Sequence, residues 1–140
     1  MAKKFGFEGL AYYGVAGSTA TTLISNRVDT TVDTDPQMAS TTVAGAGTSP
    51  PIETEGVSTI KWSATVTMKN DTTDTTLAAL RAAAAAGTPV AIRMKDHSSG
   101  KGYDGDCNVK ESSGRPINGE QTFDYSFTPN GASRTPQLCV

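Results

Sequence analysis

The stretch that decides the fold is VSTIKWSATVTMK, residues 57–69. Its apolar side chains fall on one face of an extended chain and its polar ones on the other, because successive side chains of a pleated strand point to opposite faces. The apolar face holds Ile60, Trp62, Ala64, Val66 and Met68, and the polar face holds Thr59, Lys61, Ser63, Thr65, Thr67 and Lys69. We therefore expect a long β-strand with one buried face and one wet face.

The same period of two recurs on both sides of this strand. It is found in residues 24–35, 90–95, 103–110 and 122–128. The abundance of threonine fits this pattern, since β-branched side chains suit a half-buried pleated surface. We predict one mainly β domain over residues 1–140. Its predicted core consists of Ile60, Trp62, Val66, Leu77, Leu80, Val90, Ile92, Phe123, Tyr125 and Phe127.

One alanine-rich segment has helical spacing instead. Leu77, Leu80 and Ala84 recur at helical intervals within the run 77–86, and alanine is the best helix former. Residues 71–74 offer side-chain oxygens for the free amides of a first turn, and Gly87 supplies a left-handed end. The sequence predicts a single helix between two strands, flanking the sheet.

Residues 36–56 lack any sustained apolar period, and the C-terminal stretch 132–140 lacks one as well. A structureless connection of about 20 residues is uncommon inside a compact domain and is usually functional. We expect residues 36–56 to form a long loop that contacts another chain, and residues 132–140 to extend as an arm. The candidate contact residues of the loop are Pro36, Gly45, Gly47, Pro50, Pro51, Glu53 and Glu55.

Composition and motifs exclude several classes of function. The net charge is −2 and the pI about 5.3, so the chain lacks the basic footprint of a nucleic-acid-binding regulator. His97 is the single histidine and belongs to no triad motif, and the two cysteines, Cys107 and Cys139, are expected to be reduced thiols. The acidic residues do not match a calcium loop. We predict no catalytic residue, no metal and no cofactor, and we expect neither a signal peptide nor a membrane span.

Taken in order, these elements resemble the tail tube proteins of long-tailed bacteriophages. The resemblance rests on a long strand ending in an acidic stretch, then a long loop, a second long strand, the helix and three further strands. The segments that carry it are NRVDTTVD (26–33), IKWSATV (60–66), LAAL (77–80), residues 90–94, GYDGDC (102–107) and QTFDYSFT (121–128), followed by Asn130 and Gly131. The resemblance implies a β-sandwich or barrel-like fold with one flanking helix.

The resemblance also implies a function. Six copies are expected to form a ring, and stacked rings to form the virion tail tube that conducts the DNA genome during ejection, with residues 36–56 reaching the neighbouring ring. The chain is then a structural protein and not an enzyme, assembled in the host cytoplasm. Its partners are other copies of itself, with the tape measure protein and the tail terminator as further candidates. The DNA passes through without specific binding, and no membrane is involved.

Under this resemblance the acidic strand faces are candidates for the channel wall. Six copies at −2 give −12 per ring, a charge that repels DNA phosphates. The candidate lumen residues are Asp29, Thr31, Asp33, Asp104, Asp106 and Asp124. The pattern leaves open which strand face points inward.

Other functions remain as alternatives. A tail terminator, the inner tube of a contractile tail and a secretion-type tube share the implied architecture, and the sequence separates them poorly. A secreted β-sandwich that binds a sugar or a protein partner comes from a different class. It predicts a signal peptide and exposed aromatic residues, and we expect neither in this chain.

Overall fold

The computed structural model describes residues 3–43, 50–131, 134 and 136–138. The chain divides into two compact units. The first comprises residues 1–32 and 63–140 and is called the body below; the second comprises residues 33–62 and is called the ribbon. Among the described residues, no helix has the length and hydrophobicity that crossing a bilayer requires.

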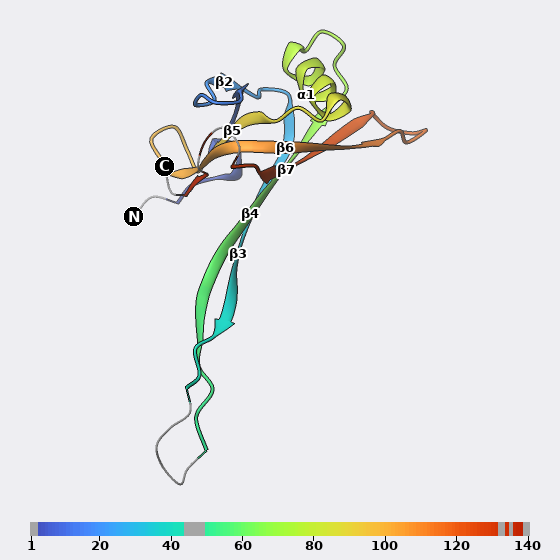
Figure 1. Ribbon diagram of the computed structural model, residues 1–140. Coiled ribbons are helices and arrows are strands. Elements are labelled where there is room, and N and C mark those ends of the chain that lie inside the picture. The colour runs from blue at the N-terminus through green and yellow to red at the C-terminus, as the bar shows by residue number, and fades with distance from the viewer. Residues whose placement is uncertain (1–2, 44–49, 132–133, 135, 139–140) are drawn as a thin grey trace. The chain divides into compact units, whose positions relative to one another are not determined.

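The chain is mainly β, with one α-helix in its described part (Figure 1). In chain order the elements are η1 (Gly6–Glu8), β1 (Leu10–Val15), β2 (Thr22–Leu23), β3 (Arg27–Ser40), β4 (Glu55–Lys69), α1 (Thr75–Ala86), β5 (Val90–Lys95), β6 (Gly102–Gly114), β7 (Thr122–Pro129) and β8 (Gln137–Leu138). The strands form one sheet in the order β2-β1-β5-β6-β7-β4-β3, and β8 pairs with β6. The predicted fold class is confirmed.

The sheet curls so that its two edges approach each other. Its edge strands β2 and β3 are joined by residues 24–26 alone, a connection too short to span a flat sheet of this width. Ile24 donates its backbone N–H to the Ala11 carbonyl at 2.9 Å and is fully buried. The Arg27 guanidinium donates to the carbonyl of Gly9, which precedes β1. These contacts make the body barrel-like.

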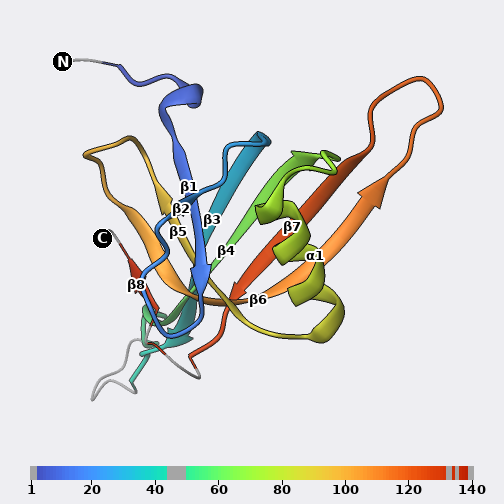
Figure 2. The ribbon, with the colours of Figure 1, turned by 90° about the horizontal axis from the view of Figure 1, so that it is seen from above.

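The helix packs on one face of the body sheet, over β6 and β7 (Figure 2). Asp74 caps its first turn by accepting a hydrogen bond from the Thr76 N–H at 3.0 Å, and Gly87 ends it with φ +71°. Leu77 and Leu80 are buried. Both ends of the helix were predicted from the sequence, because capping depends on the local residue types.

The core lies between α1 and the sheet. Nine of the ten expected core residues are buried, and Ile60 is the exception, with 51% of its surface exposed. Only Ala64–Lys69 of β4 pair with β7, so Ile60 lies in the two-stranded part of β4. Two strands have no second layer to cover an apolar face, although the alternation of the sequence continues through them. The prediction that Ile60 is a core residue is therefore wrong.

Three further differences from the sequence prediction concern the extent of two strand regions and one strand that was not predicted. The expected loop over residues 36–56 is shorter, because β3 continues to Ser40 and β4 begins at Glu55. Pro36 is accommodated because β3 is an edge strand and needs no donor there. Strand β6 continues to Gly114, four residues beyond the alternating stretch 103–110. Strand β1 was missed because its sequence LAYYGV does not alternate apolar and polar residues.

Candidate assembly surfaces

The face of the sheet opposite α1 is rich in hydroxyl groups. Side chains alternate along each strand, so Asp124 and Ser126 of β7 point away from the helix, which contacts Phe123. The register places Thr67 beside Asp124 and Asp124 beside Ser112; it also places Thr65 beside Ser126, Ser126 beside Lys110 and Thr128 beside Asn108. We call these eight residues (Thr65, Thr67, Asn108, Lys110, Ser112, Asp124, Ser126 and Thr128) the hydroxyl face.

The charges on and beside the hydroxyl face are balanced. The Thr67 hydroxyl donates to the Asp124 carboxylate at 2.6 Å, which fixes that side chain against the sheet. At the end of β4, the Lys69 ammonium pairs with Glu120 at 2.8 Å. The surface is therefore polar without a concentrated positive charge that could grip phosphate.

Two of the expected lumen residues, Asp104 and Asp106, are buried. Asp104 and Asp106 are 3% and 1% exposed, and neither reaches the surface. Arg134 covers them: Nη1 and Nη2 donate to the Asp104 carboxylate at 3.0 and 3.1 Å, and Nε donates to Asp106 at 3.0 Å. The other oxygen of Asp106 accepts from the Gly17 N–H at 3.0 Å. Their assignment to a channel wall is therefore wrong, since the alternation of β6 gives no sign of the segment that covers them.

That covering segment is the C-terminal stretch, which was expected to extend as an arm. In its described part it is held to the body, by Arg134 and by β8, which pairs with Tyr103 and Asp104 of β6. The carboxylates of Asp104 and Asp106 raise the pKa of Arg134, and the hydrogen bonds to Asp104 are the largest cause. Cys139 and much of the rest of 132–140 lie outside the described residues.

The other four expected lumen residues lie on β3 and β7. Asp29 and Thr31 are exposed on β3, and the Asp29 carboxylate accepts the Thr30 N–H at 2.8 Å. Asp33 is exposed in the ribbon. Asp124 is half-buried on the hydroxyl face.

The ribbon consists of the outer parts of β3 and β4 and carries apolar side chains that nothing in it covers. Its strands are joined beyond β3 by a hydrogen bond from the Thr41 N–H to the Thr54 carbonyl at 2.9 Å, and Ser58 donates its hydroxyl to the Gln37 carbonyl at 3.0 Å. Five large apolar residues of the ribbon are nevertheless exposed: Met38, Val43, Ile52, Val57 and Ile60. Ile52 is the most exposed of these, at 86%.

The expected loop residues fall in different parts of the ribbon. Pro50, Pro51 and Glu53 are exposed beside Ile52, whereas Pro36 belongs to β3 and Glu55 begins β4. Gly45 and Gly47 lie outside the described residues. The ribbon holds four acidic residues and one lysine, a net charge of −3, so with −2 for the whole chain the body carries +1.

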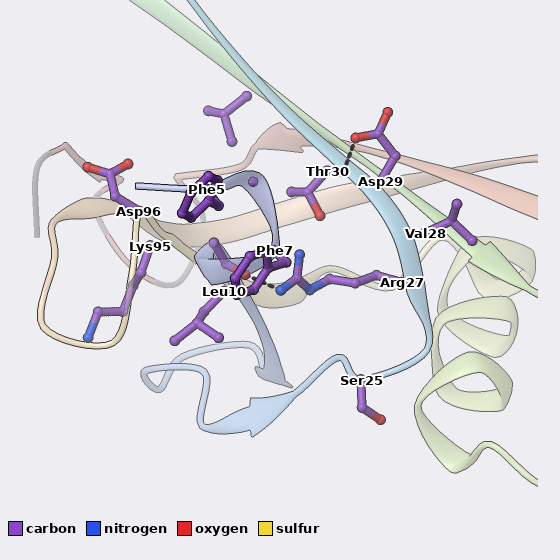
Figure 3. Close-up of a pocket in the computed structure, with 13 residues that line it drawn as sticks. Phe5, Phe7, Leu10, Ser25, Arg27, Val28, Asp29, Thr30, Lys95 and Asp96 are labelled. Atoms are coloured by element: carbon purple, nitrogen blue, oxygen red, sulfur yellow. Dashed lines mark hydrogen bonds between the residues drawn. The ribbon is translucent and has the colours of Figure 1, made fainter. Parts of the chain in front are cut away.

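A pocket of about 660 Å³ opens at one end of the body, between the N-terminal segment and the start of β3. Figure 3 shows Phe5, Phe7 and Leu10 on one side of it and Arg27, Val28 and Thr30 on the other. The Phe5 and Phe7 rings are stacked, with 5.7 Å between their centroids, and the two residues are 66% and 80% exposed. Sequence reasoning did not find this pocket, because two phenylalanines at positions 5 and 7 give no signal that they remain on the surface.

The N-terminal segment is held in place by its own hydrogen bonds. The Glu8 carboxylate accepts the Phe5 N–H at 2.8 Å and pairs with the Lys4 ammonium at 3.3 Å. The first of these bonds is the main cause that lowers the pKa of Glu8. The Phe5 carbonyl accepts the Glu8 N–H at 3.0 Å, which closes the short helix η1. The backbone that carries the two exposed rings is therefore fixed by local structure.

The groups considered for catalysis or metal binding are not brought together. His97 lies in the turn between β5 and β6, with Ser99 Oγ at 3.4 Å from its Nδ1. No group of three or more histidine, cysteine or acidic residues in the described ranges is arranged to hold a metal ion. Cys107 is a buried thiol, and burial, followed by the nearby Asp106 charge, raises its pKa to about 12.

Comparison with solved structures places this fold among tail subunits. A chain from the tail of an empty GTA particle, refined with helical C6 symmetry, matches with a TM-score of 0.75 and 14% identity over 99% of this chain and 100% of that one. A chain from the virion of a native gene transfer agent particle matches with a TM-score of 0.72 and 11% identity over the same shares. The SPP1 tail tube matches with a TM-score of 0.65 and 9% identity over 90% of this chain and 75% of that one.

No protein-family model and no curated protein matches the sequence. At these identities the likeness is one of fold. It extends over nearly the whole chain and confirms the resemblance that the order of elements predicted.

Proposed function

We propose that this chain, which has the fold of tail tube subunits, is itself the structural subunit of a virion tail tube. Copies form rings of six, rings stack, and the tube conducts DNA. The observation that carries the proposal is the match to a chain of a C6-symmetric particle tail over the full length of both chains. The protein acts by assembly, and we propose no catalytic role for it.

The exposed apolar residues of the ribbon support assembly. Isolated two-stranded hairpins are marginally stable in water, and this one keeps five large apolar side chains on its surface. Contact with another copy would remove these side chains from water, at about 25 cal/mol for each Å² of apolar surface buried. The proposed role of the ribbon, including Pro50, Pro51 and Glu53, is to join neighbouring rings.

The hydroxyl face is our candidate for the channel wall. A wall that attracted phosphate would repeat that attraction in every ring and slow the passage of DNA. Small hydroxyl groups with a balanced set of charges avoid this, and a ring of six copies carries −12 overall. Asp124 belongs to this face, and the exposed Asp29 and Thr31 of the neighbouring strand are candidates to extend it. The tape measure protein and the tail terminator are the proposed further partners, and the host cytoplasm is the proposed place of assembly.

Electron microscopy of the purified protein tests the proposal. We expect uniform hollow rods in negative stain, and a cryo-EM reconstruction of the rods in which the hydroxyl face points to the axis. Single capped rings would assign the chain to the terminators instead. A monomer that stays monomeric at high concentration would refute the proposal, and rods in which the hydroxyl face points away from the channel would refute the assignment of the wall.

A further inference from the structure

The pocket beside Phe5 and Phe7 has the properties of a protein-binding surface. Stacked aromatic rings are costly to expose, and large exposed apolar groups rimmed by polar ones mark interaction sites. Here η1 and the Glu8 contacts hold the backbone that carries the rings, and the two rings stack on each other, so the pair is presented before any partner arrives. A fixed aromatic pair loses little side-chain entropy on binding, which favours it as an anchor.

The pocket accepts an apolar side chain better than a charged one. Phe5, Phe7, Leu10 and Val28 supply its apolar lining. Its charged groups balance: Arg27 donates to the Gly9 carbonyl, Lys95 donates to the Ser98 carbonyl at 2.8 Å, and Asp29 and Asp96 supply two negative charges. The pocket volume of about 660 Å³ is larger than the volume of one isoleucine side chain. The pocket therefore has room for such a side chain together with the residues next to it in the chain.

The ribbon carries an exposed apolar side chain of the kind that this pocket accepts. Ile52 is 86% exposed and directly follows Pro50 and Pro51, whose rings fix the backbone that presents it. The net charge of the ribbon is −3 and that of the body is +1, so long-range electrostatics favours a ribbon approaching a body over two ribbons approaching each other.

The geometry points to the Phe5 and Phe7 pocket of one copy as the acceptor for the ribbon of a second copy, with Ile52 as the anchoring side chain. This inference rests on the proposed function, because it requires that copies assemble. It goes beyond that function by naming the acceptor surface and the residue that enters it.

Cross-linking between two variants tests the pairing; each carries one introduced, exposed cysteine in addition to the buried Cys107. In a Cys139→Ser background, a Phe7→Cys copy and an Ile52→Cys copy of different tag length are mixed one to one, allowed to assemble and treated with a short bis-maleimide. The expected product is the mixed-length dimer, which by construction links two copies. The control replaces Phe7→Cys by Ile117→Cys, at a fully exposed apolar position in the turn before β7.

The outcomes separate the inference from the proposed function. Mixed dimers at least about tenfold above the Ile117 control support the acceptor assignment. Assembled rods with no excess of mixed dimers over the control overturn it and leave the proposed function standing. Failure of the unsubstituted protein to assemble overturns both.

A second measurement does not depend on the cross-linker. Phe7→Ala should raise the protein concentration needed for rod formation by about tenfold, the effect of losing one anchoring aromatic residue. Ile117→Ala should change it less than about twofold. Because Phe7 is exposed, the urea midpoint of the unassembled protein should not move; equal assembly of the two variants would overturn the inference.

Discussion

Removing Arg134 should destabilise the subunit far more than removing an arginine from the surface. The Arg134 side chain is 18% exposed, and the side chains of its partners Asp104 and Asp106 are 4% and 1% exposed. Deleting one member of a buried ion pair leaves an uncompensated charge and costs about 3–5 kcal/mol. Here Arg134→Ala would leave two carboxylates, but partial exposure of the arginine admits some water, so we expect about 3 kcal/mol.

Urea unfolding of the unassembled protein measures this effect. With a slope of about 2 kcal/mol per molar, a loss of about 3 kcal/mol lowers the midpoint by about 1.5 M. The matched control is Arg81→Ala, which removes a half-exposed arginine paired with Glu111 at 3.4 Å and should cost about 1 kcal/mol or less. A triple variant, Asp104→Asn, Asp106→Asn and Arg134→Met, removes all three charges and should recover most of the loss. Equal effects of Arg134→Ala and Arg81→Ala would refute the reasoning.

Three other substitutions or conditions give independent checks. Gly87→Ala should cost about 1 kcal/mol in urea unfolding, since φ at this position is +71° and an added Cβ meets no atom within 4 Å, so the backbone conformation alone is strained. Ile60→Ser should leave the urea midpoint of the body unchanged and reduce rod formation seen by light scattering, because Ile60 is exposed in the ribbon. Burial raises the pKa of Cys107 from 9.0 to about 12, so unfolding releases a proton between these values. Stability should therefore fall as pH rises above about 9, and in a Cys139→Ser background the folded thiol should resist a thiol reagent at pH 8.

The elements that the sequence predicted are those decided by neighbouring residues. Alternation identified β4, β5 and β7, and capping residues identified α1, because both signals act within a few positions of the chain. The order of elements then carried the resemblance that comparison of folds confirms. Strand β1 was missed because it is apolar along nearly its whole length and so lacks the period.

The errors concern contacts made across long sequence separations. Ile60 continues the apolar stripe of β4, but β7 pairs only with the later part of that strand. Asp104 and Asp106 continue a polar stripe, but Arg134 and β8 cover them from about 30 residues away. Alternation states which residues share a face and does not state what lies against that face. The same limit hid the exposed pair Phe5 and Phe7.

The distribution of charge disfavours pairing between the ribbons of two copies. A two-stranded element with uncovered apolar side chains and an open edge is an aggregation hazard. Its acidic residues, Asp33, Asp35, Glu53 and Glu55, lie among those side chains and make contact between two ribbons unfavourable. The body carries the opposite sign, so attraction and apolar burial act together only when a ribbon meets a body. Contacts of that kind are head-to-tail, and head-to-tail contacts between identical copies repeat into closed rings or extended stacks.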